Sequence, residues 1–415
     1  MSKGGTSKRF VDTIGSPRSI PYDDITPVAG AAVLGTGAFG VVNAVKVEGE
    51  RSRMAFKEMK KAGGNLDEQM KQLQALNNEQ KLHYHCSQSA HVVKLLYVCS
   101  DPQGMVLELM LGGTLTARLN DKQDFPVLTL RVTLGFVKDM FEALHFLRQR
   151  RPPIAHADVK PDNLLIDERG VLKLTDFGSA RVSTPLEDAK ADSEERGPGS
   201  LLYMSPARLT GSACRCSDDM YSAGVLIGEI VSRCPQESFG TVLALNDENG
   251  FTDAVVNGGK RPLDYSPVRE SLLLNTDLCA LAQYCWNADR RKRPAPSAVL
   301  DSLDLYINKA KEDEDAEAAA AAASAAAGGG GGRGGSPPAL RRQHTYSQQQ
   351  QRKQIAESFD HFDTGEFKVG GGRQIAAEAG FKTLESRKPT RCFSFTLSCT
   401  HANQRPLFFH PLFLF

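Results

Sequence analysis

Four polar residues near the middle of the chain carry the side chains that transfer of a phosphoryl group requires. They are Asp158, Lys160, Asn163 and Asp176. Such a transfer needs a carboxylate that takes the proton of the attacking hydroxyl, a cation beside the γ-phosphate of ATP, and oxygen ligands for Mg²⁺. Each aspartate or asparagine taken singly could be a loop cap. Their order and spacing together favour a single site instead.

A glycine-rich segment lies between two runs of β-forming residues. It reads Gly35-Thr36-Gly37-Ala38-Phe39-Gly40-Val41-Val42. A hairpin of this kind can lie close over phosphate groups, with its backbone N–H groups facing their oxygens. Taken alone, the segment could also be a purely structural turn. A dinucleotide-binding loop would need a helix directly after the glycines, and a second β-like run follows here instead.

A lysine and a glutamate upstream of these four residues could supply a fixed ammonium. Lys57 follows the apolar residues 54–56, and it could be an ordinary lysine that extends from a strand edge. Residues 65–85 lack proline and glycine, which predicts a helix. Glu79 on this helix could turn inward and pair with Lys57, and the pair would then bind phosphate. Glu68 on the same helix is the alternative partner.

The remaining pattern places strands before helices. Runs of strand type cover residues 33–47, 55–59, 92–99 and 104–109. Residues 128–150 have apolar side chains at helical spacing, which predicts an amphipathic helix. We therefore expect an α+β protein, with a small β-rich lobe followed by a larger α-helical lobe.

Together these motifs resemble the eukaryotic protein kinase superfamily over residues 30–308. Lys160 resembles the serine/threonine type, and residues 285–300 resemble the tyrosine-kinase-like group. The resemblance implies a bilobal fold, with an N-lobe at about 26–110 and a C-lobe at about 111–309. It also implies transfer of the γ-phosphate of ATP, with Mg²⁺, to serine or threonine hydroxyls of a protein substrate.

The same resemblance assigns roles to individual residues. The catalytic residues it implies are Asp158, Lys160, Lys57 and Glu79. The magnesium ligands it implies are Asn163 and Asp176. The residues implied to contact ATP are Gly35, Thr36, Gly37, Ala38, Phe39, Gly40, Val42, Ala55, Lys57, Leu107, Glu108, Met110, Asn163, Leu165 and Asp176.

Two positions depart from the family pattern. Ala157 stands where an arginine usually precedes the catalytic aspartate, so we expect activity that depends little on activation-loop phosphorylation, as in a non-RD kinase. Ala207 stands where a glutamate usually pairs with an arginine, so we expect either that Arg293 finds another partner or water, or that the peptide-docking segment is looser. Residues 200–206 resemble the peptide-docking segment, and Asp219 resembles an aspartate that braces the catalytic loop.

The chain ends have a different composition. Residues 1–25 are polar and predict a flexible segment. Residues 310–355 are of low complexity and predict a disordered linker, although the alanine run could extend a helix locally. Residues 356–415 predict a poorly ordered tail. It begins with half of an EF-hand-like motif that lacks the required oxygen ligands, so we do not expect calcium binding.

The composition of the chain excludes some classes of binding partner. Lysine plus arginine (50) nearly balances aspartate plus glutamate (49), so no charge field indicates nucleic acid. No run approaches the roughly 20 apolar residues of a membrane helix. Nine cysteines without paired zinc-type spacing, and no secretory signal, favour reduced thiols in the cytoplasm or nucleus. The oligomeric state has no signal in the sequence.

Two alternative functions stay open. Ala157 and Ala207 also suit a pseudokinase scaffold that binds nucleotide and partners with little turnover. The retention of all four polar residues of the central set favours an active enzyme over that scaffold. A kinase of small molecules is disfavoured by the peptide-docking segment, residues 200–206.

Overall fold

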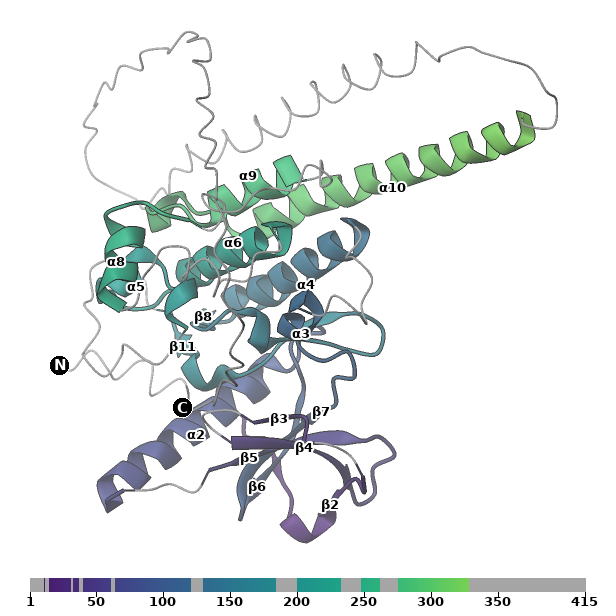
Figure 1. Ribbon diagram of the computed structural model, residues 1–415. Helices are drawn as coiled ribbons and strands as arrows, with labels where there is room; N and C mark the ends of the chain where they lie inside the picture. Colours follow the sequence, from purple (N-terminus) through teal and green to yellow (C-terminus); the bar gives the residue numbers. More distant parts are fainter. Residues whose placement is uncertain are drawn as a thin grey trace, which may run out of the picture. The chain divides into compact units, whose positions relative to one another are not determined.

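A computed structural model describes residues 11, 15–30, 33–36, 40–60, 64–120, 130–183, 200–232, 248–261 and 275–327. These residues form a β-sheet lobe followed by a helical lobe (Figure 1). The predicted α+β, bilobal fold class is confirmed. Among the described residues, no helix combines the length and the apolar character needed to cross a bilayer.

The N-lobe is built on a seven-stranded sheet. Its strands are β1 (Arg18–Ser19), β2 (Ile25–Pro27), β3 (Gly35–Thr36), β4 (Gly40–Val47), β5 (Met54–Met59), β6 (Leu95–Ser100) and β7 (Gln103–Glu108). The order is β1-β6-β7-β5-β4-β2, with β3 paired to β4. All pairings are antiparallel except that of β1 with β6.

Alternation along the central strands separates the two faces of this sheet. On β5, Met54 and Phe56 lie in one apolar cluster, whereas Ala55 between them lies in another. On β7, Val106 joins the first cluster, and the residues on either side of it join the second. Successive side chains of a strand point to opposite faces, so one face packs on α2 (Leu66–Cys86) and the other is left to be covered.

Residues 15–25 cover that second face, which corrects the prediction of a flexible segment for this described part of residues 1–25. Strand β1 pairs with β6, and the N–H of Ile20 donates to Val98 O at 3.0 Å. Ile20 and Ile25 are buried against the sheet. The polar composition of the segment gave no sign that these two isoleucines would be buried. Their burial, together with pairing to the free edge of β6, is enough to order residues 15–25.

Helix α2 begins at a capping box. Asn65 Oδ1 accepts from the N–H of Glu68 at 3.0 Å, and Glu68 Oε2 accepts from the N–H of Asn65 at 3.1 Å. Glu68 therefore stabilises the start of the helix and is not the partner of Lys57. Figure 1 shows α2 beside the sheet, on the side that faces the helical lobe.

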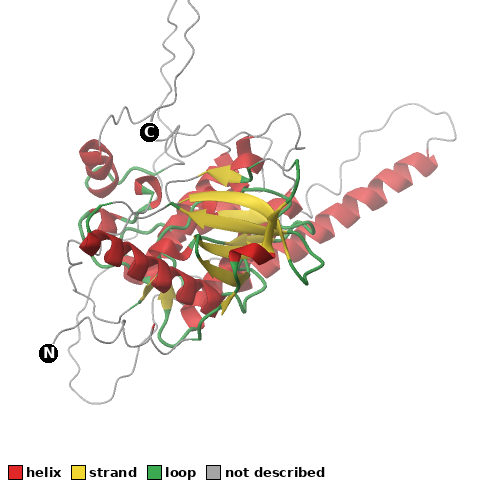
Figure 2. Ribbon diagram, turned by 90° about the horizontal axis from the view of Figure 1, so that it is seen from below, coloured by secondary structure: helices red, strands yellow, loops and turns green. Residues whose placement is uncertain are grey.

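The C-lobe is helical around one large core. Its helices are α3 (Leu115–Asn120), α4 (Leu130–Gln149), α5 (Pro206–Leu209), α6 (Cys216–Ser232), α8 (Glu248–Val256), α9 (Asn275–Cys285) and α10 (Pro296–Ala327). Short strands form two further pairs, β8 (Ile154–Ala155) with β11 (Arg181–Val182), and β9 (Leu164–Ile166) with β10 (Leu172–Leu174). Figure 2 shows the sheet strands gathered in one place, with the helices lying around them.

Helix α10 corrects the predicted start of the disordered linker. It continues without interruption from Pro296 to Ala327, through the acidic and alanine-rich residues that the sequence assigned to the linker. Alanine has the highest intrinsic helix propensity, and the first glycine after Pro296 is Gly328. Residues 328–355 and the EF-hand-like tail lie outside the described residues.

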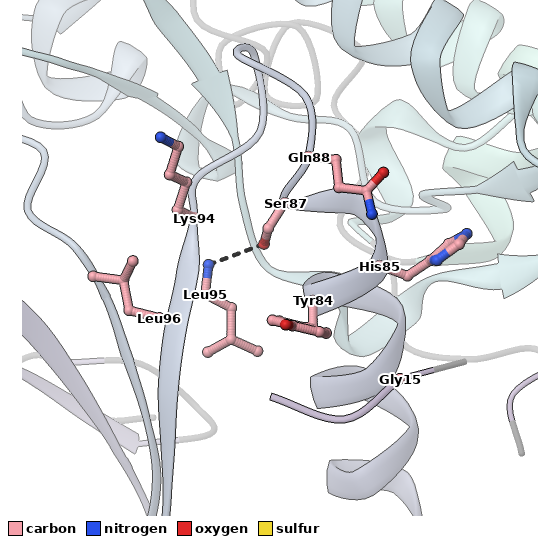
Figure 3. Close-up of a pocket in the computed structure, with 8 residues that line it drawn as sticks. All are labelled: Gly15, Tyr84, His85, Ser87, Gln88, Lys94, Leu95 and Leu96. Atoms are coloured by element: carbon pink, nitrogen blue, oxygen red, sulfur yellow. Dashed lines mark hydrogen bonds between the residues drawn. The ribbon is translucent and has the colours of Figure 1, made fainter. Parts of the chain in front are cut away.

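A cavity of about 330 Å³ lies between the C-terminal end of α2 and the start of β6, beside Gly15 of the N-terminal segment (Figure 3). Its lining residues are Gly15, Tyr84, His85, Ser87, Gln88, Lys94, Leu95 and Leu96. Ser87 Oγ accepts from the N–H of Leu95 at 2.9 Å across one wall. None of the residues that the sequence predicts for the site lines this cavity.

Candidate active site

Lys57, Glu79 and Asp176 meet between the two lobes. Strand β5 carries Lys57, α2 carries Glu79, and Asp176 precedes the short turn Phe177–Ser179. Lys57 Nζ lies 3.1 Å from Glu79 Oε1 and 3.0 Å from Asp176 Oδ1. The lysine is therefore held between two carboxylates and does not extend freely from the strand edge.

The charges in this group support one another. Burial alone would lower the pKa of Lys57, but Glu79 and Asp176 raise that pKa above its ordinary value. Burial alone would raise the pKa of Asp176, but Lys57 holds it below its ordinary value. At neutral pH the group consequently presents an ammonium and an ionised Asp176.

Asp158 lies at the centre of a second hydrogen-bonded group. Its Oδ2 is 2.9 Å from Lys160 Nζ and accepts from Asn163 Nδ2 at 2.9 Å. Its Oδ1 accepts from the backbone N–H of Ser200 at 2.9 Å. Lys160 Nζ also donates to Ser200 Oγ at 2.9 Å. The predicted base, its neighbouring cation and the start of the docking segment are thus in direct contact.

Backbone hydrogen bonds connect the two groups. The N–H of Thr175 donates to Asn163 O at 2.9 Å, so the segments that carry Asn163 and Asp176 lie side by side. Asp219 accepts from the N–H groups of His156 and Ala157, both at 2.8 Å. The brace expected from Asp219 is therefore present, and it is buried.

Two strained backbone conformations lie at the same place. Within the described residues, the non-glycine residues with positive φ are Ala157 (68°) and Asp176 (64°). Such conformations are uncommon for residues with a Cβ, and they persist where the surrounding contacts enforce them. One of them precedes Asp158 directly, and the other is a predicted magnesium ligand.

The glycine-rich segment is a hairpin, as predicted, and not the strand-to-helix turn of a dinucleotide site. Gly35 pairs with Val42 and Thr36 with Val41 in adjacent strands. A Cβ on Gly40 would lie 2.0 Å from Glu58 O, so glycine is required there for close approach of β4 to β5. The tip of the hairpin, Gly37, Ala38 and Phe39, lies outside the described residues.

The predicted adenine-binding residues lie in one apolar cluster. Ala55 and Leu107 are buried in it, and the partly buried Val42, Met110 and Leu165 pack against it. These residues come from β4, β5, β7, the connection after β7, and β9, so both lobes contribute. An apolar surface of this kind suits a flat aromatic base.

Glu108 turns its side chain away from that cluster. Its Oε1 accepts from the N–H of Lys94 at 2.8 Å, and its Oε2 lies 2.8 Å from Lys173 Nζ. The carboxylate therefore connects the end of β7 to β10 in the C-lobe. Only the backbone of Glu108 is left to contact a nucleotide.

The donor set fits ATP with magnesium. Asn163 uses its amide nitrogen toward Asp158, which leaves the amide oxygen as the atom that could bind a metal. Asp176 adds carboxylate oxygens, and such hard ligands suit Mg²⁺. No cluster of three His, Cys, Asp or Glu side chains exists in the part of the chain that the structure describes. Phosphate oxygens and water would therefore complete the coordination, as is usual for Mg²⁺.

Two histidines that the sequence analysis did not single out enclose Phe177. Its ring stacks on His83 at 4.7 Å between centroids and meets His156 edge-on at 5.1 Å. His83 Nε2 donates to Val93 O at 2.7 Å, and His156 Nε2 donates to Thr175 O at 2.9 Å. His83 follows Glu79 by four residues, so helical spacing could have placed it on the same face of α2.

The comparisons with known proteins agree with this geometry. The family model described as "Protein kinase domain" matches residues 29–303, about two-thirds of the chain. The chain belongs to the protein kinase family.

Curated relatives of this kinase domain are distant. "cGMP-dependent protein kinase, isozyme 2 forms cD5/T2" of Drosophila melanogaster is 32% identical over 215 residues, 51% of this chain and 22% of that protein. "Receptor-interacting serine/threonine-protein kinase 2" of Bos taurus is 27% identical over 222 residues, 52% of this chain and 40% of that protein. "Dual specificity protein kinase shkC" of Dictyostelium discoideum is 28% identical over 280 residues, 66% of this chain and 50% of that protein. The chain thus spans half or less of the length of these relatives.

His83 should make the kinase domain sensitive to acid. Complete burial lowers the pKa of His83 from 6.5 to about 4. The unfolded chain then binds a proton that the folded chain excludes, so the stabilisation is present above pH 6.5 and is lost as the pH falls toward 4. The loss from His83 alone should reach about 3 kcal/mol. Urea unfolding at several pH values measures it.

A variant without the imidazole is the control for this titration. His83→Leu should flatten the pH dependence of the unfolding free energy between pH 7 and 4.5. Equal slopes for wild type and His83→Leu would show that His83 does not titrate in this range.

Arg293 has a new partner in place of the glutamate that Ala207 replaces. Its Nη1 lies 3.0 Å from Asp218 Oδ1, and Asp218 Oδ2 lies 3.0 Å from Arg290 Nη2. Ser205 Oγ also donates to Asp218 at 2.7 Å. The side chains of Arg293 and Asp218 are almost fully buried, at 0% and 2% exposure. The expectation that Arg293 finds another partner is confirmed.

Asp218→Ala should therefore destabilise the C-lobe strongly. It would leave a buried guanidinium without its carboxylate, which typically costs about 3–5 kcal/mol. Urea denaturation should show this loss in the free energy of unfolding. Asp304→Ala breaks the exposed pair with Lys138 and should cost at most about 1 kcal/mol. A similar small loss in both variants would contradict the role given to Asp218.

The surroundings of Ala157 support the prediction that activity depends little on phosphorylation of the activation loop. The side chain of Ala157 packs with Ala155 and Cys214 in a small apolar cluster, so it offers a phosphate no cation. We expect phosphatase treatment, or alanine at Ser183, to leave the rate of phosphoryl transfer unchanged. Thr184 and Ser193, for which we expect the same, lie outside the described residues. Loss of activity through loss of a phosphate at any of these positions would contradict this.

Proposed function

We propose that this chain is an active serine/threonine protein kinase that uses ATP and Mg²⁺. The observation that carries the proposal is the joining of two groups, Lys57–Glu79–Asp176 and Asp158–Lys160–Asn163, by direct backbone contacts. Every group that phosphoryl transfer requires is present. That retention supports an enzyme over a pseudokinase scaffold.

The proposed reaction follows from the placement of Asp158 and Lys160. The substrate hydroxyl gives its proton to Asp158, and the hydroxyl oxygen forms a bond to the γ-phosphorus of ATP. The bond between the γ-phosphorus and the oxygen that bridges it to the β-phosphate breaks, which releases ADP. Lys160 offsets negative charge on the transferred group. Lys57 holds phosphates of the nucleotide. Asn163 and Asp176 would hold Mg²⁺, which neutralises phosphate charge when bound.

The serine/threonine preference has separate support. Lys160 bonds both to Asp158 and to Ser200, so the docking segment meets the proposed base through this lysine. One relative is named a serine/threonine kinase, and another is named a dual-specificity kinase. Tyrosine is thus the competing acceptor, and analysis of the phosphorylated residue separates the two.

We also propose a cytoplasmic or nuclear setting and one catalytic domain over residues 26–309. The cysteines among the described residues are free thiols, which supports a reducing compartment.

The decisive experiment incubates the purified chain with radiolabelled ATP, Mg²⁺ and a generic basic protein. The wild type should transfer label to serine or threonine, and Asp176→Ala should not. Label on tyrosine would refute the serine/threonine preference. Absence of label, with a nucleotide-induced rise in melting temperature, would favour the scaffold.

A further inference from the structure

Arg208 lies two residues after the docking segment (residues 200–206) and reaches to the loop that carries Asp158. It lies on α5, and its residue is 9% exposed. Its Nη1 donates to the carbonyl oxygen of Ala157 at 2.6 Å. A guanidinium in a buried region requires a partner, and here that partner is the backbone directly before the proposed base.

The peptide groups of Ala157 are consequently fixed at both ends. Its N–H donates to Asp219 Oδ1 at 2.8 Å, and its carbonyl accepts from Arg208. Between these two bonds the residue has φ of 68°, a left-handed conformation that is unfavourable for a residue with a Cβ. The two buried hydrogen bonds can hold such a conformation.

Asp219 is deeply buried, at 3% exposure. This burial raises the pKa of Asp219 to about 7, against the lowering effect of the two N–H donors and of the nearby Arg208. Asp219 and Arg208 thus hold the two peptide groups on either side of the Ala157 Cα, one by its N–H and the other by its carbonyl.

The docking segment also contacts Asp158 directly. Ser200 N–H donates to Asp158 Oδ1, and Arg208, eight residues later, holds the carbonyl that precedes Asp158. One continuous stretch, residues 200–208, therefore contacts both the carboxylate of Asp158 and the carbonyl of the residue before it. A displacement of this segment would move the carboxylate.

We propose that Arg208 is a positioning residue that fixes the orientation of Asp158 through the Ala157 carbonyl. This inference rests on the proposed kinase function. It goes further by assigning the geometry of the proposed base to a side chain of α5, directly after the docking segment.

The test compares kcat, the KM for ATP and the nucleotide-induced rise in melting temperature. Arg208→Met should lower kcat by about 10²-fold, because a misplacement of about 1 Å has that effect. The KM for ATP and the nucleotide-induced rise should stay as in the wild type, because Arg208 touches neither Lys57 nor the adenine cluster. Arg208→Lys keeps one donor for the single hydrogen bond, so its kcat should lie within about tenfold of the wild type.

A second-site change probes the backbone directly. Glycine takes φ of 68° without steric cost, so Ala157→Gly added to Arg208→Met should recover part of the lost kcat. Arg261→Met is the matched control, since Arg261 is also 9% exposed and donates to a backbone carbonyl, Val255 O at 3.1 Å. It should keep its kcat.

Three results would each overturn the inference. The first is an unchanged kcat in Arg208→Met, the second is a loss of kcat in Arg261→Met as large as that in Arg208→Met, and the third is no recovery of kcat when Ala157→Gly is added to Arg208→Met. If Arg208→Met does not fold, Arg208→Gln replaces it, because its side chain is polar yet two atoms shorter and should lose kcat in the same way. An inactive wild type would refute the proposed function itself, which separates the two failures.

Discussion

Asp158→Asn is expected to lower kcat by about 10²–10⁴-fold while the chain stays folded. The carboxylate accepts hydrogen bonds from Ser200 N–H and from Asn163 Nδ2, and it pairs with Lys160. An amide has nearly the same shape, but it cannot take the proton of the attacking hydroxyl. Its NH₂ group would also face donors. Steady-state transfer from ATP to a peptide measures the loss.

A neighbouring aspartate supplies the control for this substitution. Asp162 lies in the same loop, is exposed, and accepts from Thr116 Oγ1 at 2.7 Å. Asp162→Asn should therefore keep its kcat. Melting temperatures of both variants within a few degrees of the wild type would show that folding is intact. A kcat above one-tenth of the wild-type value in Asp158→Asn would mean that this carboxylate does not act as the base.

Lys57→Met is expected to lower kcat/KM by about 10²–10³-fold, the usual effect of removing one preorganised electrostatic group. The change leaves Glu79 and Asp176 without the ammonium that lies 3.1 and 3.0 Å from them. Since Lys57 holds the pKa of Asp176 down, that pKa should rise in the variant. Nucleotide binding should weaken as well.

The measurement combines kinetics with the rise in melting temperature that ATP and Mg²⁺ induce. Lys57→Met should lose most of this rise, whereas Lys46→Met, at an exposed position of β4 in the same sheet, should keep it. A Lys57→Met protein that binds nucleotide and turns over like the wild type would show that the ammonium does not contact phosphate.

Much of the fold and of the candidate site was accessible from local sequence patterns. The run of residues 55–59 predicts a strand, and the absence of breakers in 65–85 predicts the helix. Once both elements exist, Lys57 and Glu79 can meet in a single arrangement, with Glu68 left to cap the helix. The spacing from Asp158 onward depends only on a short loop and a hairpin, which sequence describes well.

Other features depended on contacts between distant residues. Residues 15–25 look flexible by composition, yet an open strand edge and two buried isoleucines order them. Helix α10 continues into a low-complexity segment because alanine propensity acts locally there. His83 follows Glu79 at helical spacing, but Arg208 has no local signal, since its partner Ala157 is 51 residues away.

The most direct measurement of the central claim is an experimental structure of the chain with Mg²⁺ and a non-hydrolysable ATP analogue. The triphosphate should lie within hydrogen-bonding distance of Lys57 Nζ, with the metal about 2.1 Å from oxygens of Asn163 and Asp176. Asp158 should face the γ-phosphate. A nucleotide bound elsewhere, or these side chains turned to separate places around it, would contradict the account.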